Sequence, residues 1–99
     1  MAILNEPLYK HLAASGAVTT NAKAGILHYV VFTGATVGDI LVVADGATTQ
    51  ITLVTSVANA PVYFEPPRDK RPQFTTDIDA TITKAGNAYA TFIYEEIQS

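Results

Sequence analysis

After residue 16 the chain consists of short runs rich in Val, Ile, Thr, Tyr and Phe, separated by Gly, Asn, Asp and Pro. Runs of this kind are typical of short strands joined by turns. The pattern predicts strands at residues 17–20, 26–33, 39–45, 49–57, 62–65, 73–78, 80–84 and 88–95. Asp45-Gly46 and Gly86-Asn87 tolerate positive φ, which allows hairpins to reverse. Seven or eight short strands at this spacing predict an all-β, single-domain antiparallel β-sandwich, either a jelly roll or another Greek-key arrangement.

The strands differ in how many of their faces are apolar. In the run at 49–57 one face holds Ile51, Leu53, Thr55 and Val57, and the other holds Gln50, Thr52 and Ser56, with Val54 as the exception. The runs at 26–32 and 88–94 are bulky on both faces. Ile26, Val30 and Phe32 oppose Leu27, Tyr29 and Val31, while Ala90, Phe92 and Tyr94 oppose Tyr89 and Ile93. A strand that is apolar on both faces lies under a covering element or against a partner.

Residues 1–16 form an N-terminal arm in this interpretation, and residues 17–99 form the sandwich domain. The spacing of Ile3, Leu4, Leu8 and Leu12 suits one or two helical turns, although Pro7 discourages a longer helix. The arm could cover one apolar strand, and a neighbouring subunit could cover the rest.

Composition narrows the classes of partner. The charged fraction is 15%, well below the roughly 25% of ordinary soluble domains, so part of the surface is expected to contact something other than water. The net charge of −3 disfavours nucleic acid as a partner. No apolar run is long enough to span a bilayer and the start lacks a secretory signal, so we expect no membrane partner and synthesis in a cytoplasm. The absence of cysteine excludes disulfides.

The sequence offers little catalytic chemistry. It contains no phosphate-binding glycine loop, no Gly-x-Ser-x-Gly and no His-Glu-x-x-His motif. Asp77-Ile-Asp79-Ala-Thr81 superficially resembles the nucleophile loop of haloacid-dehalogenase-type phosphotransferases, but that loop belongs to a larger α/β domain. In a strand these aspartates lie on a solvated face, opposite Ile78, Ala80 and Ile82. His11 and His28 have no recognisable partners, so we expect a protein that is not an enzyme, with no catalytic residues, no cofactor and no metal.

The segment from Glu65 to Pro72 mixes both charge signs between prolines and predicts a stiff loop. It is either an ordinary solvated connection or a docking loop whose basic residues meet an acidic neighbour. Together with the arm and the two-faced strands, it supplies the residues expected at a protein interface. These are Ile3, Leu4, Leu8, Tyr9, Tyr29, Val62, Tyr63, Phe64, Arg68, Lys70, Arg71, Tyr89 and Ile93.

Four segments carry a resemblance to a known class of proteins. They are Ala24-Gly-Ile-Leu-His-Tyr-Val-Val-Phe32, Gly38-Asp-Ile-Leu-Val-Val-Ala-Asp-Gly46, Phe74-Thr-Thr-Asp-Ile78 and Ala90-Thr-Phe-Ile-Tyr-Glu-Glu96. Over roughly residues 24 to 96 the layout resembles the small β-sandwich virion proteins of tailed bacteriophages, which are often jelly rolls and which decorate or cement heads or act as adaptors.

The resemblance implies a homo-oligomer in the virion that docks on other virion proteins, either the major capsid protein or a tail or neck protein. One alternative is a neck or tail adaptor. Another is a module that binds glycans or a host surface, for which Tyr29, Tyr63, Tyr89 and Tyr94 would be the exposed aromatic residues.

Overall fold

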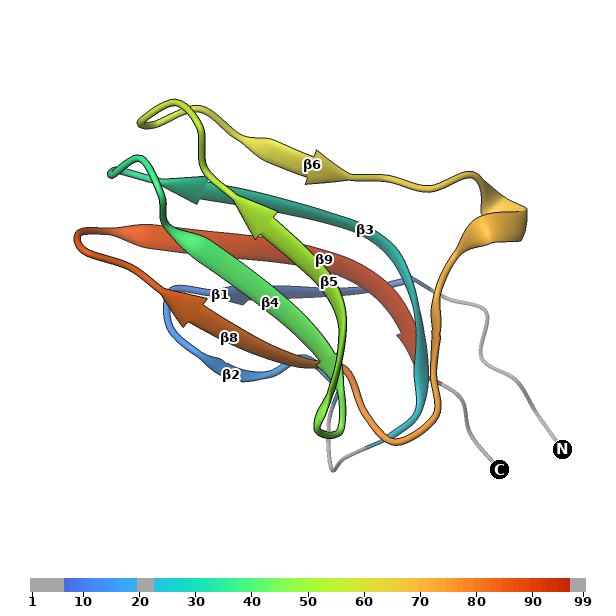
Figure 1. Cartoon of the computed structure of the whole chain (residues 1–99). Helices are drawn as coiled ribbons and strands as arrows, with labels where there is room; N and C mark the ends of the chain where they lie inside the picture. Colours follow the sequence, from blue (N-terminus) through green and yellow to red (C-terminus); the bar gives the residue numbers. More distant parts are fainter. Residues whose placement is uncertain (1–6, 20–22, 97–99) are drawn as a thin grey trace, which may run out of the picture.

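The computed structural model describes residues 7–19 and 23–96, which form two antiparallel β-sheets packed face to face (Figure 1). Sheet A has the order β1 (Leu8–Leu12), β9 (Ala88–Glu96), β3 (Gly25–Gly34) and β6 (Val62–Phe64), and the two-residue β7 (Gln73–Phe74) also pairs with β3. Sheet B has the order β2 (Gly16–Ala17), β8 (Asp79–Thr83), β4 (Ile40–Asp45) and β5 (Thr48–Val54). The predicted all-β sandwich is therefore confirmed.

The pairing of the strands is that of a jelly roll. The first four strands pair, in reverse order, with strands from the second half of the chain: β1 with β9, β2 with β8, β3 with β6, and β4 with β5. Successive pairs lie in alternate sheets: β1–β9 and β3–β6 in sheet A, β2–β8 and β4–β5 in sheet B. The chain therefore folds back as one long double strand wrapped around the core. This order distinguishes the jelly roll from the other Greek-key sandwiches that the sequence left open.

Apolar side chains from the inner faces of both sheets fill the space between them. Phe32 and Phe92 from sheet A, Leu41 and Val43 from sheet B, and Phe74 from β7 are completely buried. Burial of one such side chain contributes about 1.5–3 kcal/mol. A single core shared by both sheets makes the sandwich one packing unit.

The N-terminal arm differs from the helical turns that the sequence predicted. Leu8–Leu12 forms strand β1, paired along its length with β9 from Leu8 opposite Tyr94 to Leu12 opposite Ala90. Leu12 packs against the core. The helical interpretation is wrong here because Leu8 and Leu12 also fit the two-residue period of a strand, and the ladder with β9 satisfies their backbone groups.

A β-bulge in β3 changes the face on which two predicted residues lie. Leu27 lies opposite Tyr94 and Tyr29 lies opposite Ile93, so His28 is an extra residue without a counterpart in β9. Before the bulge Leu27 is buried and Ile26 faces outward, whereas after it Val30 and Phe32 are buried. The predicted grouping of Ile26 with Val30 and Phe32 is wrong because strict alternation does not pass through a bulge.

The strand predicted at 73–78 is also shorter than expected. Only Gln73–Phe74 pairs with β3, and the chain then turns to meet the β4–β5 hairpin. The Asp45 carboxylate accepts hydrogen bonds from the backbone N–H groups of Thr75 at 2.9 Å and Thr76 at 2.8 Å. Gly46, at φ +60°, donates its N–H to Asp77 Oδ1 at 2.9 Å. These side-chain acceptors take the place of a strand partner.

Candidate functional site

The outer face of sheet A gathers most of the chain's tyrosines. Residues directly opposite each other in antiparallel strands share a face. Tyr9 lies opposite Ile93, Ile93 opposite Tyr29, Tyr63 opposite Val31, and Tyr89 opposite Thr33. Four strands thus place four of the five tyrosines on one side of the sheet. We call this surface the tyrosine face and define it as Tyr9, His11, Tyr29, Val31, Tyr63, Tyr89, Thr91 and Ile93.

The tyrosine face is not covered by the described part of the chain. Tyr9 is 68% exposed, Tyr63 is 58% exposed and Tyr89 is 46% exposed, although each has a large aromatic ring. Neighbouring rings touch one another, with ring centroids 6.0 Å apart for Tyr29 and Tyr63 and 5.5 Å apart for His11 and Tyr89. His11 Nδ1 also lies 3.1 Å from Thr91 Oγ1. The result is an ordered aromatic surface in contact with water.

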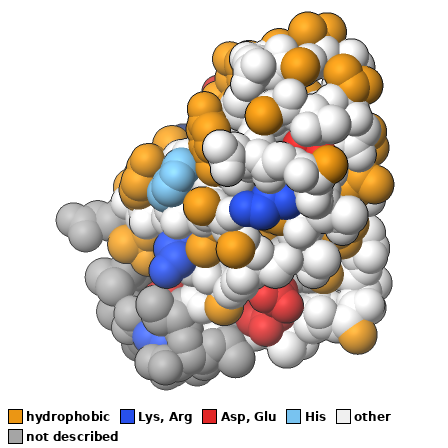
Figure 2. All heavy atoms as spheres, turned by 90° about the vertical axis from the view of Figure 1, so that its left-hand side faces the viewer, with side chains coloured by type: hydrophobic (Ala, Val, Ile, Leu, Met, Phe, Trp, Pro, Cys, Tyr) orange, Lys and Arg blue, Asp and Glu red, His pale blue; other side chains and the backbone are white. Residues whose placement is uncertain are grey.

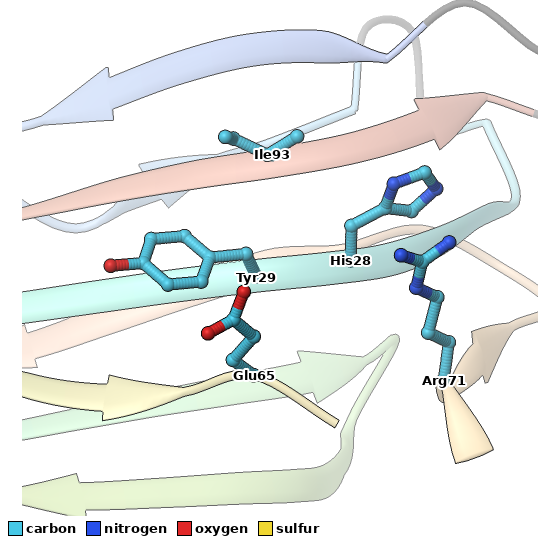
Figure 3. A pocket seen from close by; sticks show the side chains of 5 residues that line it. All are labelled: His28, Tyr29, Glu65, Arg71 and Ile93. Atoms are coloured by element: carbon cyan, nitrogen blue, oxygen red, sulfur yellow. The ribbon is translucent and has the colours of Figure 1, made fainter. Parts of the chain in front are cut away.

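Charged side chains meet this face at its end near η2 (Arg68–Lys70). There a hollow of about 450 Å³ is lined by His28, Tyr29, Glu65, Arg71 and Ile93 (Figure 3). The bulge presents His28 on the outer side, where its Nε2 contacts the Glu95 carboxylate. Arg71 follows directly after η2, so the short helix positions its side chain over the sheet.

Burial at the edge of the hollow raises the pKa of the Tyr29 phenol above its ordinary value, and the neighbouring Tyr63 and Glu65 raise it further. The phenol is therefore neutral at physiological pH and available as a hydrogen-bond donor.

The structure brings together five of the predicted interface residues, Tyr9, Tyr29, Tyr63, Tyr89 and Ile93, on the tyrosine face. It places Arg71 at the hollow and leaves Arg68 and Lys70 exposed on η2.

Three of the other predicted residues lie elsewhere, and two fall outside the described part. Val62 and Phe64 flank Tyr63, so they turn to the opposite side of β6, and Phe64 packs against the core. Leu8 turns away from the tyrosine face and is 38% exposed at the sheet edge. Ile3 and Leu4 lie outside the described residues. The alternative use of Tyr94 as an exposed aromatic residue is wrong, because Tyr94 is 3% exposed in the core.

Several residues of the site had no strong signal in the sequence. Val31 can be assigned to this face from strand alternation alone. By contrast, Glu95 contacts His28 because β3 pairs with β9, and Glu65 lines the same hollow as His28 because β3 pairs with β6. Pairing partners more than sixty positions apart cannot be assigned from local pattern.

A second surface lies at the end of the sandwich that faces the reader in Figure 2. Three connections meet there and are joined by backbone hydrogen bonds, from Ala35 N to Asn87 O at 2.8 Å and from Asn59 N to Gly34 O at 2.8 Å. Val37 and Val57 are about 60% exposed on these connections, at 59% and 60%. Figure 2 shows hydrophobic side chains scattered over this end with small, separate charged areas. Their scatter makes this end a less coherent binding surface than the tyrosine face.

The Asp77-x-Asp79-x-Thr81 string has a structural explanation. As predicted, Ile78, Ala80 and Ile82 are buried while Thr81 and Thr83 are exposed on the other side. Asp77 accepts the hydrogen bond from the hairpin glycine, Gly46. Within residues 7–19 and 23–96, no group of three or more His, Cys, Asp or Glu side chains is arranged to hold a metal ion.

None of the protein-family models, curated proteins or solved structures that were compared matches this chain. In the described ranges no helix has the length and apolarity required to span a membrane.

Proposed function

We propose that this chain is a non-enzymatic structural protein of a tailed-bacteriophage particle, of the head decoration or cement type. In this proposal the chain forms homo-oligomers through the tyrosine face, and the oligomer docks on a neighbouring virion protein. The observation that carries the proposal is the exposure of Tyr9, Tyr63 and Tyr89 on a single sheet face that no described element covers.

The composition of the tyrosine face supports a protein partner. Tyrosine is enriched at protein interfaces and charged residues are depleted from their centres. None of the eight members of the tyrosine face is Asp, Glu, Lys or Arg. A stable interface needs about 800 Å² from each partner, and aromatic side chains bury about 150–250 Å² each. Four partly exposed tyrosines with Ile93 and Val31 can supply much of that area.

The setting in a virion is supported by two further observations. The jelly-roll order of the strands is common among viral capsid domains, although the same fold also occurs in lectins. The segments around 24–32, 38–46, 74–78 and 90–96 resemble small phage virion sandwiches, and they correspond to β3, β4, the β7–β8 segment and β9. The fold suits either setting, and the resemblance favours the virion.

Sedimentation velocity tests the docking surface. We expect the wild-type chain to sediment as an oligomer at micromolar concentration, and we expect the double variant Tyr63→Lys/Tyr89→Lys to sediment as a monomer. Placing an unpaired ammonium in a dry interface costs on the order of several kcal/mol. The matched control is Val54→Lys/Val57→Lys, which adds the same charge at positions that are 48% and 60% exposed on β5 and after it.

Both variants should keep wild-type circular dichroism, because all four side chains lie at the surface. A wild-type chain that stays monomeric, or a tyrosine double variant that still assembles, would contradict the use of this face.

The virion setting has its own test. Tailed phage particles from a host carrying this sequence should contain the protein in many copies by mass spectrometry. Class averages from electron micrographs of particles with and without the protein should differ at the capsid surface. Absence of the protein from purified particles would rule out the virion role and leave the docking face to be assigned to another assembly.

A further inference from the structure

The hollow at the end of the tyrosine face is lined by an arginine, Arg71, whose Nε–H group lacks an acceptor. Arg71 is half-buried, and its Nε atom is shielded from water with no hydrogen-bond partner among the described residues. Buried N–H donors are almost always paired, since an unpaired donor costs about as much free energy as a lost hydrogen bond. The Nε–H group itself is closed off by the protein, and the remaining N–H groups of the guanidinium are the donors that Arg71 offers to a ligand in the hollow.

Neither Glu65 nor Glu95 forms an ion pair with this arginine. Within the described part of the chain the ion pair of this region joins His28 to Glu95, and Glu65 makes no ion pair with Arg71. Figure 3 shows the Arg71 guanidinium turned toward the His28 ring, while the Glu65 carboxylate lies beside Tyr29. The hollow thus presents a strong donor on one side and a strong acceptor on the other.

The balance of charge selects the chemistry of the ligand. Among the residues that line the hollow, the carboxylate of Glu65 stands against the guanidinium of Arg71, while the Glu95 carboxylate beside the hollow is engaged by His28. A phosphate or an acidic sugar would therefore meet as much repulsion as attraction. A neutral molecule rich in hydroxyl groups can accept from Arg71 and donate to Glu65 at the same time.

The remaining walls suit the carbon skeleton of such a molecule. Tyr29 and Ile93 lie next to each other across the β3–β9 pair and form the apolar side of the hollow. Its volume of about 450 Å³ falls within the roughly 300–1,000 Å³ typical of small-ligand sites. Sugar rings combine an apolar C–H face with a polar edge, which matches this division of the walls.

We propose that the hollow between β3, β9 and the segment 65–71 binds a neutral saccharide, with Arg71 donating to ring hydroxyl oxygens and Glu65 accepting from ring hydroxyls. Tyr29 packs against the C–H face of the sugar. This binding site goes beyond the proposed docking function and does not depend on it, although both use Tyr29 and Ile93. A partner on the tyrosine face and a saccharide would therefore compete.

The test is a titration of ¹⁵N-labelled protein, followed by NMR, with D-glucose, D-galactose, D-mannose and N-acetyl-D-glucosamine. Inorganic phosphate and N-acetylneuraminic acid serve as anionic probes. We expect at least one neutral sugar to give saturable shifts at the amides of residues 28, 29, 65, 71 and 93. A ligand with about a dozen heavy atoms corresponds to a millimolar Kd.

Two variants and one control locate the site. Arg71→Ala and Glu65→Gln should each weaken binding by about tenfold or more, because each removes a charge-assisted hydrogen bond. The control Arg68→Ala removes an exposed arginine three residues away that does not line the hollow, and it should bind as the wild type does.

The same titration on Tyr63→Lys/Tyr89→Lys separates this proposal from the docking function. Saturable sugar binding to that variant supports the site even if the wild-type oligomer occludes it. The proposal is overturned if no neutral sugar binds to either protein, or if phosphate or N-acetylneuraminic acid binds more tightly than every neutral sugar. It is also overturned if folded Arg71→Ala and Glu65→Gln bind with unchanged affinity.

Discussion

At the scale of single residues, Asp45 connects two parts of the fold that are distant in sequence. Its carboxylate accepts the N–H groups of Thr75 and Thr76 and the Thr75 hydroxyl at 3.0 Å, so the β4–β5 turn is tied to the segment after β7. These hydrogen bonds, led by the one from Thr75 N–H, lower the pKa of Asp45 below its ordinary value of 3.8. The ionised form is therefore the one that the folded state prefers.

This preference gives a pH-dependent prediction. A lowered folded-state pKa stabilises the protein above the unfolded value of 3.8, and that stabilisation is lost as the pH falls through the lower folded value. We expect Asp45→Asn to lower the urea midpoint at neutral pH, because a neutral amide is a weaker acceptor for these donors. The deficit should shrink in acid below the folded pKa.

Asp69→Asn, at an exposed position in η2, is the matched control and should leave the urea midpoint nearly unchanged. A deficit for Asp45→Asn that persists unchanged in acid would show that the carboxylate charge is not the stabilising feature.

At the scale of the element, the bulge in β3 determines which side chains reach the outer face. His28 is the residue without a counterpart in β9, and its removal would leave Leu27 and Tyr29 opposite Tyr94 and Ile93 in unbroken alternation. The bulge is thus needed for the position of His28 beside Glu95 and for the hollow, but the core does not require it.

Deletion of His28 should therefore be tolerated. We expect the shortened chain to keep cooperative thermal unfolding with a loss of about 1–2 kcal/mol, because the inward positions of Leu27, Val30 and Phe32 are preserved. Deletion of Val31, in the regular part of the strand, should prevent folding. That deletion shifts part of β3 by one residue and exposes core side chains, each of which contributes about 1.5–3 kcal/mol when buried. The total free energy of unfolding of a domain is about 5–15 kcal/mol, so the loss of a few such contributions is enough to unfold it.

Circular dichroism melting of both deletions checks this prediction. If both unfold the protein, the bulge is required by the core after all, and if both are tolerated, the register of β3 is less fixed than its pairing indicates.

Strands in which apolar and polar residues alternate clearly could be predicted from the sequence. Features that depend on pairing between distant segments could not. Strand β5 was found because Ile51 and Leu53 are separated by polar residues, and β9 because Ala90, Phe92 and Tyr94 form one apolar face. Strand β1 was missed because Leu8 and Leu12 satisfy a helical period as well as a strand period. The bulge at His28 and the hollow depend on β9 and on the 65–71 segment, which local patterning does not place.

At the scale of the whole molecule, the two sheets are held by one set of side chains. Phe32 and Phe92 on sheet A meet Leu41 and Val43 on sheet B in a single core. We expect Phe92→Ala to destabilise the protein by about 3–5 kcal/mol while preserving one cooperative transition.

Hydrogen exchange measured on the amides of both sheets checks this prediction. The most protected amides of sheet A and sheet B should lose protection together in Phe92→Ala, whereas Tyr89→Phe on the outer face should leave both unchanged. Loss of protection confined to sheet A would mean that the sheets unfold as separate units.

The pairing of β1 with β9 also has a consequence for biosynthesis. Leu8 and Tyr94 are neighbours in space but belong to opposite ends of the described chain, whereas β4 and β5 are joined by a short turn at Gly46. On a translating ribosome the β4–β5 hairpin can form early, but in sheet A the strand that lies between β1 and β3 is missing until β9 emerges. The nascent chain therefore carries its apolar residues unshielded until nearly all of the sandwich has been synthesised, and during that interval it depends on chaperones or rapid release to avoid aggregation.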